Sequence, residues 1–409
     1  MNVHISGPSN LLLKSDIQIT GSKSESNRSL LLQALFDAIS IQNLSNSDDA
    51  RVMQEGLAIS KGIVDIHHAG TAMRFLTGYF ASHEGKEVTL TGSKRMTERP
   101  ISVLVDALRE LGANITYEAN EGYPPIAIKG RKLTKSKVSL PADISSQYIS
   151  SLLLIAPHLE NGLELDLVGK ITSVPYIKMT LGLLDQIGVS TSFEGNTIKV
   201  SPKKNVEATE LVVESDWSSA SYFYSIVALS DIGTEITLGF YKLNSLQGDS
   251  VLSEIYKDFG VETDFIDHRI VLRKVRHPRS RIFEYDLANA PDLAQTIAVT
   301  CFGLGIGCEL KGLHTLKIKE TDRLEAMHTE LSKFGAMVSV TNKTLSLKPS
   351  AEIISGVQVD TYNDHRMAMA FGPLAFKSSF TVNDAGVVSK SYPDYWNDLK
   401  KLGLSILEE

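Results

Sequence analysis

Serine, lysine, arginine and aspartate side chains recur at the starts of expected helices, and these starts are evenly spaced. Four of them are numbered 145, 218, 291 and 364, so each step is 73 residues. They read Ser145-Ser146-Gln147, Ser218-Ser219-Ala220, Pro291-Asp292-Leu293 and Asp364-His365-Arg366, and Gly70-Thr71-Ala72 and Ser24-Glu25-Ser26 open two earlier helices. Unpaired N–H groups and a partial positive charge make a helix start suited to an anion. Reactive side chains repeated at such starts predict one shared anion site.

The distribution of cations indicates the same kind of ligand. The net charge is −7, which disfavours a general nucleic-acid binder with a broad basic face. Lysine and arginine nevertheless gather in the motif turns, at Lys23, Arg28, Arg74, Arg95, Arg99, Lys319, Arg323, Arg366 and Lys390. Arginine forks match carboxylate and phosphate oxygens in pairs. We therefore expect a pocket for a small anion.

Taken singly, these residues also have ordinary structural interpretations. Asp292 is typical of a helix N-cap, and residues 320–323 are typical of a solvated helix start with local ion pairs. Paired serines such as Ser145 and Ser146 cap helices more often than they bind phosphate. For Ser218-Ser219 we expect a cap and nothing more.

The helices that carry these turns belong to a repeated unit. Behind each start comes a run too apolar to face water, such as residues 149–155 and 367–376. Amphipathic segments that close at a glycine follow, at residues 101–111, 177–187, 252–259, 324–334 and 395–402. Most of these segments precede a short β-prone run. A buried helix, strands, an amphipathic helix and a strand, repeated at a fixed period, predict an α/β fold of stacked copies.

Length and cysteine content limit the number of domains and the compartment. Two domains of about 200 residues fit a chain of 409, with a break near residues 214–216. Cys301 and Cys308 lack a metal-ligand partner at a useful spacing, so we expect inert thiols. Residues 11–13 are too short for a signal-peptide core, and the longest apolar stretch, residues 297–306, is too short for a membrane span. We expect a cytoplasmic protein.

Seven strings, in order along nearly the whole chain, resemble the motifs of one enzyme family. They are GSKSESNRSLLLQAL from Gly21, AGTAMR from Ala69, RMTERPI from Arg95, SSQY from Ser145, KETDRL from Lys319, NDHRMAMAF from Asn363 and SKSYPDYW from Ser389. By this resemblance the chain is identified as a member of the 5-enolpyruvylshikimate-3-phosphate synthase family (3-phosphoshikimate 1-carboxyvinyltransferases), one of the enolpyruvyl transferase families.

The resemblance implies a two-domain α/β fold, the inside-out α/β barrel of enolpyruvyl transferases. Six βαβαββ units, three per domain, would surround buried parallel helices. One domain would comprise residues 21–213, and the other residues 1–20 with 214–409. The substrates would lie in the cleft between the two domains.

The implied reaction transfers the enolpyruvyl group of phosphoenolpyruvate to the 5-hydroxyl of shikimate 3-phosphate and releases phosphate. The family uses it in the shikimate pathway to chorismate and the aromatic amino acids, and glyphosate inhibits it. The resemblance implies no cofactor and no metal. Partners would be the two small-molecule substrates, without nucleic acid or membrane, and we expect a monomer.

The resemblance also assigns roles to individual residues. Asp292 would be the base toward the 5-hydroxyl, and Glu320, with Lys23 close by, would handle the methylene proton. Phosphoenolpyruvate would be bound by Lys23, Gly70, Arg99, Gln147, Arg323, Arg366 and Lys390. Shikimate 3-phosphate would be bound by Lys23, Ser24, Arg28, Ser145, Ser146, Gln147, Ser173, Tyr176, Asp292 and Lys319.

Two alternatives stay open at this point. One is an enolpyruvyl transferase acting on UDP-N-acetylglucosamine. Such enzymes have a Lys-Asn opening and generally a reactive cysteine, sometimes an aspartate, on a mobile loop in the first-half domain. This chain has Lys23-Ser24, and both its cysteines lie beyond residue 300. The other is a non-catalytic anion-binding descendant, for which loss of Asp292, Lys23 or Glu320 would be the sign; all three are present.

Three positions depart from the family pattern. His68 stands where Asn commonly precedes Ala-Gly-Thr, Phe75 where Pro often follows the arginine, and Thr315 where Asn commonly lies four residues before Lys319. We predict that replacing Phe75 by Pro and His68 by Asn changes the affinity for phosphoenolpyruvate and for glyphosate. Steady-state kinetics with the inhibitor would measure the affinity constants for phosphoenolpyruvate and for glyphosate. If both stay unchanged, these departures do not affect substrate or inhibitor binding.

Overall fold

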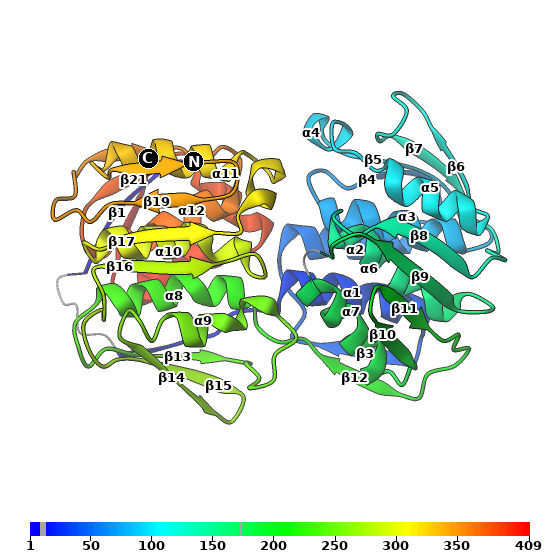
Figure 1. Cartoon of the computed structure of the whole chain (residues 1–409), viewed down its shortest axis with the longest axis horizontal. Coiled ribbons are helices and arrows are strands. Elements are labelled where there is room, and N and C mark those ends of the chain that lie inside the picture. The colour runs from blue at the N-terminus through cyan, green and yellow to red at the C-terminus, as the bar shows by residue number, and fades with distance from the viewer. Residues whose placement is uncertain (9–13, 172–173) are drawn as a thin grey trace. The chain divides into compact units, whose positions relative to one another are not determined.

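The chain folds into two compact units. The computed structural model describes residues 1–8, 14–171 and 174–409 (Figure 1). Unit 1 comprises Met1–Thr20 and Glu214–Glu409, and unit 2 comprises Gly21–Val213. The chain therefore leaves unit 1 after Thr20 and returns to it after Val213.

Unit 2 is built from alternating helices and short strands. Its helices are α1 (Lys23–Leu35), α2 (Asp48–Ala58), α3 (Gly70–Ser82), α4 (Lys94–Thr97), α5 (Ser102–Leu111), α6 (Ser146–Ile155), the 3₁₀ turn η1 (Ala156–His158) and α7 (Val174–Gln186). Its strands are β3 (Ile39–Gln42), β4 (Lys61–Asp65), β5 (Glu87–Thr91), β6 (Asn114–Tyr117), β7 (Ile126–Lys129), β8 (Lys137–Pro141), β9 (Leu163–Val168), β10 (Thr191–Glu194), β11 (Thr197–Val200) and β12 (Thr209–Val212).

Unit 1 repeats this alternation. Its helices are α8 (Trp217–Leu229), α9 (Leu252–Ile255), α10 (Ala294–Gly303), α11 (Arg323–Lys333), α12 (His365–Phe371) and α13 (Tyr395–Lys401), with 3₁₀ turns η2 (Gly248–Val251), η3 (Pro291–Leu293), η4 (His314–Ile318), η5 (Gly372–Phe376) and η6 (Ala385–Lys390). Its strands are β1 (Val3–Ser6), β2 (Lys14–Ile17), β13 (Glu235–Gly239), β14 (Val261–Ile266), β15 (Arg269–Lys274), β16 (Ile282–Asp286), β17 (Gly307–Lys311), β18 (Val338–Val340), β19 (Leu345–Leu347), β20 (Val357–Val359), β21 (Phe380–Val382) and β22 (Ser405–Glu408).

One sheet pattern recurs in both units. In unit 2 the chain runs β4–α3–β5–α5–β6–β7 and the strands lie in the order β4-β5-β7-β6. β4 and β5 are parallel, and β7 pairs antiparallel with both β5 and β6. The segment β16–α10–β17–α11–β18–β19 of unit 1 has the same order and the same directions. The predicted α/β repeat is therefore confirmed as a βαβαββ unit.

The first residues of the chain complete two sheets of unit 1. β2 pairs parallel with β13, with Lys14 opposite Glu235, and so supplies the first strand of a repeat whose helix is α8. β1 lies between β21 and β22 and pairs antiparallel with both. Both segments of unit 1 are needed because these strands would otherwise leave unpaired edges.

One repeat of unit 2 is shorter than the others. Its two described strands, β12 and β3, pair in parallel and accompany α1 and α2. Only Ile59 and Ser60 separate α2 from β4, so no chain remains for the closing hairpin. The fold class is as expected, but this copy ends after its second helix.

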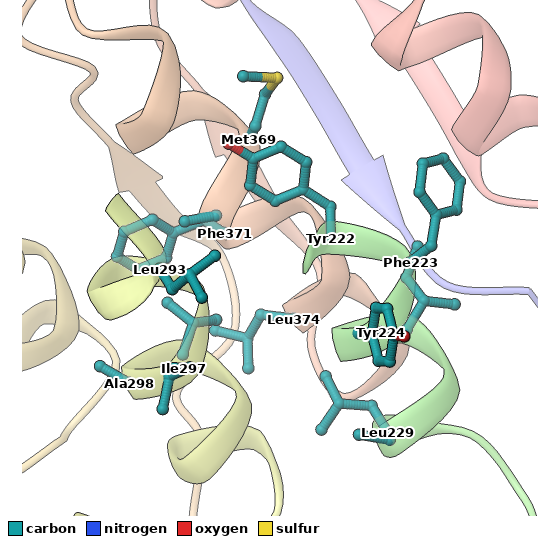
Figure 2. Packing of buried hydrophobic residues seen from close by; sticks show 14 of the residues in the cluster. Tyr222, Phe223, Tyr224, Leu229, Leu293, Ile297, Ala298, Met369, Phe371 and Leu374 are labelled. Atoms are coloured by element: carbon teal, nitrogen blue, oxygen red, sulfur yellow. The ribbon is translucent and has the colours of Figure 1, made fainter. Parts of the chain in front are cut away.

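Each unit buries three of its helices almost completely. All residues of α3 are buried, and α6 and α1 contact it. In unit 1, Ile297 of α10 and Leu374 of η5 point toward one another beside Leu293 (Figure 2). A Cβ added to Gly303 would meet Leu229 of α8 at 2.7 Å, so the glycine lets these helices approach closely. A helix apolar on all sides is stable only inside such a layer, which explains why the helix starts converge within each unit.

Within the described ranges, no helix is both long and apolar enough to cross a membrane.

Candidate functional site

A single buried guanidinium organises the charged residues of unit 1. Arg323 opens α11 and is 2 % exposed. Its Nε and Nη2 donate to Asp364 Oδ2 and Oδ1 at 2.7 and 3.2 Å. Its Nη1 donates to Asp292 Oδ1 and its Nη2 to Glu320 Oε2, each at 2.9 Å. Burial lowers the pKa of Arg323, but the three carboxylates outweigh burial and hold it above its usual value.

Asp292 lies among three cations from two segments, residues 319–323 and the start of α12. Besides the bond from Arg323, Arg366 Nη2 donates to its Oδ2 at 3.1 Å, and Lys319 Nζ lies 3.5 Å from its Oδ1. Burial is the largest single influence and raises the pKa of Asp292. The attraction of Arg366, Lys319 and Arg323 together exceeds it, so the pKa is held well below its usual range. Asp292 is therefore a carboxylate that binds protons weakly.

Lys390 and Glu320 complete this group. Lys390, the last residue of η6, donates from Nζ to Glu320 Oε1 at 3.0 Å, while Glu320 Oε2 accepts from Arg323. The structure thus brings together six residues predicted for the site, and they come from four separate segments. These residues are Asp292, Lys319, Glu320, Arg323, Arg366 and Lys390.

Helix starts position these side chains. Asp364 is the N-cap of α12 and accepts from Arg366 N at 2.9 Å, so one carboxylate both caps the helix and holds Arg323. Asp322 caps α11 by accepting from Glu325 N, which fixes Arg323 at the first helical position. Carboxylate caps also interact favourably with the helix dipole.

In unit 2, Arg28 joins three helices. Its Nε donates to Thr180 Oγ1 at 2.8 Å in α7, and its Nη2 to Ser150 Oγ at 2.9 Å in α6. Its Nη1 donates to the Ser24 carbonyl at 2.8 Å, and its Cζ lies 6.0 Å from the Tyr176 ring centroid. Burial lowers its pKa to about 10, against smaller opposing effects of Tyr176 and Glu25. Arg28, Ser24 and Tyr176 are thus grouped as expected from their assignment to one substrate.

The start of α3 lies against the segment that carries Arg99. A Cβ on Gly70 would meet Arg99 Nη1 at 2.7 Å, so the absence of a side chain lets the guanidinium lie over the helix start. Gln147 Nε2 donates to Thr71 Oγ1 at 3.1 Å, which brings the start of α6 beside that of α3. Three residues predicted for phosphoenolpyruvate, Gly70, Arg99 and Gln147, therefore gather in unit 2.

The remaining predicted residues of unit 2 lie at the same helix starts. Lys23 Nζ, on α1, is 3.3 Å from Asp49 Oδ2, at the start of α2. Ser145 is the N-cap of α6 and accepts from Gln147 N, while Ser146 is buried. A cap is compatible with anion binding because further N–H groups stay available. Ser173 lies outside the described residues.

A cavity of about 640 Å³ in unit 2 is not part of this arrangement. It is lined by Ser82, Glu84, Lys132, His158 and Lys203, among others. Ser82 ends α3 and His158 ends η1, so the cavity lies at the far ends of the helices whose starts carry Gly70 and Gln147. No residue predicted for the site lines it.

The three departures from the family pattern have definite surroundings. His68 Nδ1 lies 2.8 Å from Ser93 Oγ, the N-cap of α4. Phe75 is fully buried, and the Arg28 Cζ lies 5.2 Å from its ring centroid, so its ring supports that guanidinium. Thr315 Oγ1 is buried without a hydrogen-bond partner in the described part of the chain.

Some contributors were not predicted. The N-cap of α8 is Asp216, which accepts from Ser219 N at 2.7 Å, so the expectation that Ser218 is only a cap is wrong. Ser218 Oγ instead accepts from Arg366 Nη2 at 3.1 Å. Asp364 stands in a quoted motif, but its partner Arg323 lies 41 residues earlier, and only folding brings them together.

In unit 2, Arg74 is a further contributor to which the sequence assigned no individual role. It is buried, and its Nη1 donates to Gly70 O at 3.2 Å and its Nη2 to Pro100 O at 3.1 Å. One carbonyl belongs to Gly70 itself, and the other to the residue that follows Arg99. Burial, and then the charge of Arg99, lowers the pKa of Arg74 to about 10. Arg74 therefore ties the α3 start to the turn that carries Arg99.

Comparison with known proteins decides the family. The family model for EPSP synthase (3-phosphoshikimate 1-carboxyvinyltransferase) matches residues 56–399. The chain belongs to this family. A 3-phosphoshikimate 1-carboxyvinyltransferase of Bacteroides fragilis (strain YCH46) is 45% identical over 412 residues, covering 99% of each chain. One of Shewanella pealeana is 36% identical, covering 94% of this chain and 96% of its own.

Solved structures of EPSP synthase share the fold. One from Acinetobacter baumannii superposes with a TM-score of 0.83 over 100% of both chains at 20% identity, and a second from that organism with a TM-score of 0.81. At this identity the likeness shows the fold. The expected two-domain enolpyruvyl transferase architecture is therefore confirmed.

We predict that Arg74→Lys destabilises the protein, because a lysine cannot donate to the Gly70 and Pro100 carbonyls in the same fixed fork. Loss of these buried charged bonds costs about 2 kcal/mol. Chemical denaturation would measure the loss. Arg95→Lys is the matched control, since Arg95 is exposed and pairs with exposed Glu98. Equal stability of the two variants would contradict the bridging role of Arg74.

Proposed function

We propose that the chain transfers the enolpyruvyl group of phosphoenolpyruvate to the 5-hydroxyl of shikimate 3-phosphate and releases phosphate, in aromatic amino acid biosynthesis. Membership of the family and the full-length likeness to enzymes of that name support the reaction. The observation that carries it to this site is Asp292, a buried carboxylate held by Arg323, Arg366 and Lys319. Such an array suits a reaction in which a base works among bound anions.

The substrates bring two carboxylates and two phosphates, and both units offer cations to bind them. In unit 1, Arg323, Arg366 and Lys390 are bound by the protein's own carboxylates. We assign these three to phosphoenolpyruvate, whose oxygens would take over part of the bonds that Asp292 and Glu320 now accept. The cations are therefore already oriented before the ligand arrives, which reduces the reorganisation needed at the reaction.

This exchange gives Asp292 its basicity. Three cations of the protein hold its pKa low. Once substrate anions share Arg323 and Arg366, the attraction of these cations for Asp292 weakens. Because Asp292 stays buried, its pKa then rises. Asp292 then takes the proton of the 5-hydroxyl while the hydroxyl oxygen forms a bond to C2 of phosphoenolpyruvate.

Glu320 is assigned the proton at the methylene carbon. As phosphoenolpyruvate takes over bonds from Lys390 and Arg323, Glu320 takes up a proton from solvent and delivers it to that carbon while the carbon–oxygen bond forms, which yields a tetrahedral adduct. Glu320, again a carboxylate, then removes a proton from the resulting methyl group, which restores the double bond and expels phosphate. Glu320 lies between Lys390 and Arg323, and a group bound to both can exchange its proton as their other partners change.

In unit 2 we propose the binding site for shikimate 3-phosphate and the remaining residues that bind phosphoenolpyruvate. Ser145 and Ser146 at the α6 start suit the phosphate, and Arg28 with Tyr176 suits the ring carboxylate. Lys23, Gly70, Arg99 and Gln147 lie at helix starts of the same unit. We propose that both groups of residues act on one pair of substrates.

The alternatives are less well supported. The matched relatives are named 3-phosphoshikimate 1-carboxyvinyltransferase, which favours shikimate 3-phosphate over UDP-N-acetylglucosamine. Asp292, Glu320 and Lys23 are all present, which argues against a non-catalytic descendant. The buried free thiols of Cys301 and Cys308 fit a reducing compartment, and we propose a cytoplasmic monomer.

The reaction can be tested by phosphate release from phosphoenolpyruvate with and without shikimate 3-phosphate. We predict that release requires shikimate 3-phosphate. Asp292→Asn keeps the shape of the side chain but removes the base, so kcat should fall by about 10²- to 10⁴-fold. Calorimetry should still detect binding of shikimate 3-phosphate by this variant.

Asp231→Asn is the control, because Asp231 is exposed and lies in the same unit. Its turnover should equal that of the wild type. Binding of shikimate 3-phosphate by the wild-type protein without any phosphate release would instead favour the non-catalytic alternative, and full activity of Asp292→Asn would refute the assignment of the base.

A further inference from the structure

The hydroxyl of Ser218 lies between two buried charged groups. Arg366 Nη2 donates to Ser218 Oγ at 3.1 Å, and the hydroxyl in turn bonds to Asp249 Oδ2. Ser218 is in the first turn of α8, Asp249 in η2 and Arg366 at the start of α12. Three segments far apart in the sequence thus meet at one hydroxyl, and the cap of α8 is a different residue.

The direction of each hydrogen bond follows from the groups involved. A guanidinium has donors only, so Ser218 Oγ must accept from Arg366. A hydroxyl has one proton, so Ser218 Oγ donates its single hydrogen bond to the Asp249 carboxylate. Asp249 therefore fixes the rotation of the hydroxyl and turns its lone pairs toward Arg366. The result is a chain of hydrogen bonds that runs from Arg366 through Ser218 to Asp249.

The same guanidinium nitrogen also reaches the proposed base. Arg366 Nη2 donates to Asp292 Oδ2 at 3.1 Å, as well as to Ser218. Both N–H bonds of this nitrogen lie in the plane of the guanidinium, so two acceptors on it fix the orientation of that plane. Asp249 is 6 % exposed, and burial, followed by the charge of Asp292, raises its pKa to about 6 against the opposing effects of Arg366 and Ser218. It is therefore mostly ionised, and accepts, at neutral pH.

We propose that Ser218 and Asp249 are positioning residues that hold the Arg366 guanidinium in the orientation that binds phosphoenolpyruvate. The inference rests on the proposed function, which assigns Arg366 to that substrate. Without the hydroxyl, Arg366 would keep its bonds to Asp292 but lose the acceptor on its other side. A long side chain with one anchor fewer loses more conformational freedom when an anion binds.

The first experiment compares the steady-state kinetics of Ser218→Ala with the wild type. Because the anchor acts on binding of one substrate, KM for phosphoenolpyruvate should rise about tenfold, which corresponds to about 1.4 kcal/mol. KM for shikimate 3-phosphate and kcat should change by less than about threefold, since no group that touches the reacting atoms is removed. Ser218→Thr restores a hydroxyl and should return KM toward the wild-type value.

Ser221→Ala is the matched control. Ser221 lies one turn further along α8, and its hydroxyl donates to Ser218 O and lies 3.1 Å from Thr296 Oγ1. This variant removes a buried hydroxyl from the same helix without touching Arg366, so KM for phosphoenolpyruvate should not change. An equal rise in both variants would mean a general disturbance of α8 and would overturn the inference.

A second variant tests the hydrogen-bond chain itself. Asp249→Asn removes the charge that orients the hydroxyl, and it should raise KM for phosphoenolpyruvate by less than Ser218→Ala does. The double variant should be no worse than Ser218→Ala alone, because both changes act through one bond to Arg366. Additive effects would contradict a shared path.

Calorimetric binding of phosphoenolpyruvate separates this inference from the proposed reaction. If the wild type binds it without turnover, the proposed function fails, yet about tenfold weaker binding by Ser218→Ala would still support the positioning role. Equal binding by wild type and Ser218→Ala would overturn the inference whether or not the wild type turns over. Absence of wild-type binding would overturn both.

Discussion

The buried guanidinium of Arg323 is the constraint on which the charged site of unit 1 depends. It holds carboxylates from the turn before α10, from the turn before α11 and from the start of α12. A charge this deeply buried is stable only while paired, and each carboxylate is likewise stable only beside its cation. The arrangement therefore fixes three chain segments together, and it orients Arg366, Lys319 and Lys390 through the carboxylates that those cations share with Arg323.

The repeated βαβαββ unit explains why such residues can meet at all. In each copy, one helix that accompanies the two parallel strands is buried. The three buried helices of a unit pack against one another. Their starts then lie together, and in unit 1 the residues that open them become neighbours despite steps of 73 residues in the sequence. Unpaired N–H groups at these starts attract anions, while aspartates there serve both as caps and as partners for arginine. Stability and binding thus use the same positions.

Much of this was predictable because it rests on local patterns. Apolar runs behind polar turns predicted the buried helices, and closing glycines predicted the ends of α5, α7, α11 and α13 to within two residues. The segment 252–259 was wrong in length, since α9 ends at Ile255. Pairings across long stretches of chain were not predictable. The strand order, in which β1 and β2 complete two sheets of unit 1, follows from β-pairing rather than from any local signal. Ser218 looked like a cap because Ser145 is one, but Asp216 takes that place and leaves the hydroxyl to Arg366.

The most direct test of the central constraint is the unfolding free energy of Arg323→Met as a function of pH. Removing one partner of a buried ion pair costs about 3–5 kcal/mol, so we predict a loss of that size at pH 7. The pKa of Asp292 is lowered in the folded state, so the stability that its cations provide is complete above the unfolded pKa of about 3.9 and is lost as pH falls below it. The gap between wild type and variant should stay constant from about pH 7 to pH 5 and narrow below about pH 4. A loss of less than about 1 kcal/mol at pH 7, or a gap that does not narrow in acid, would contradict the central place given to Arg323.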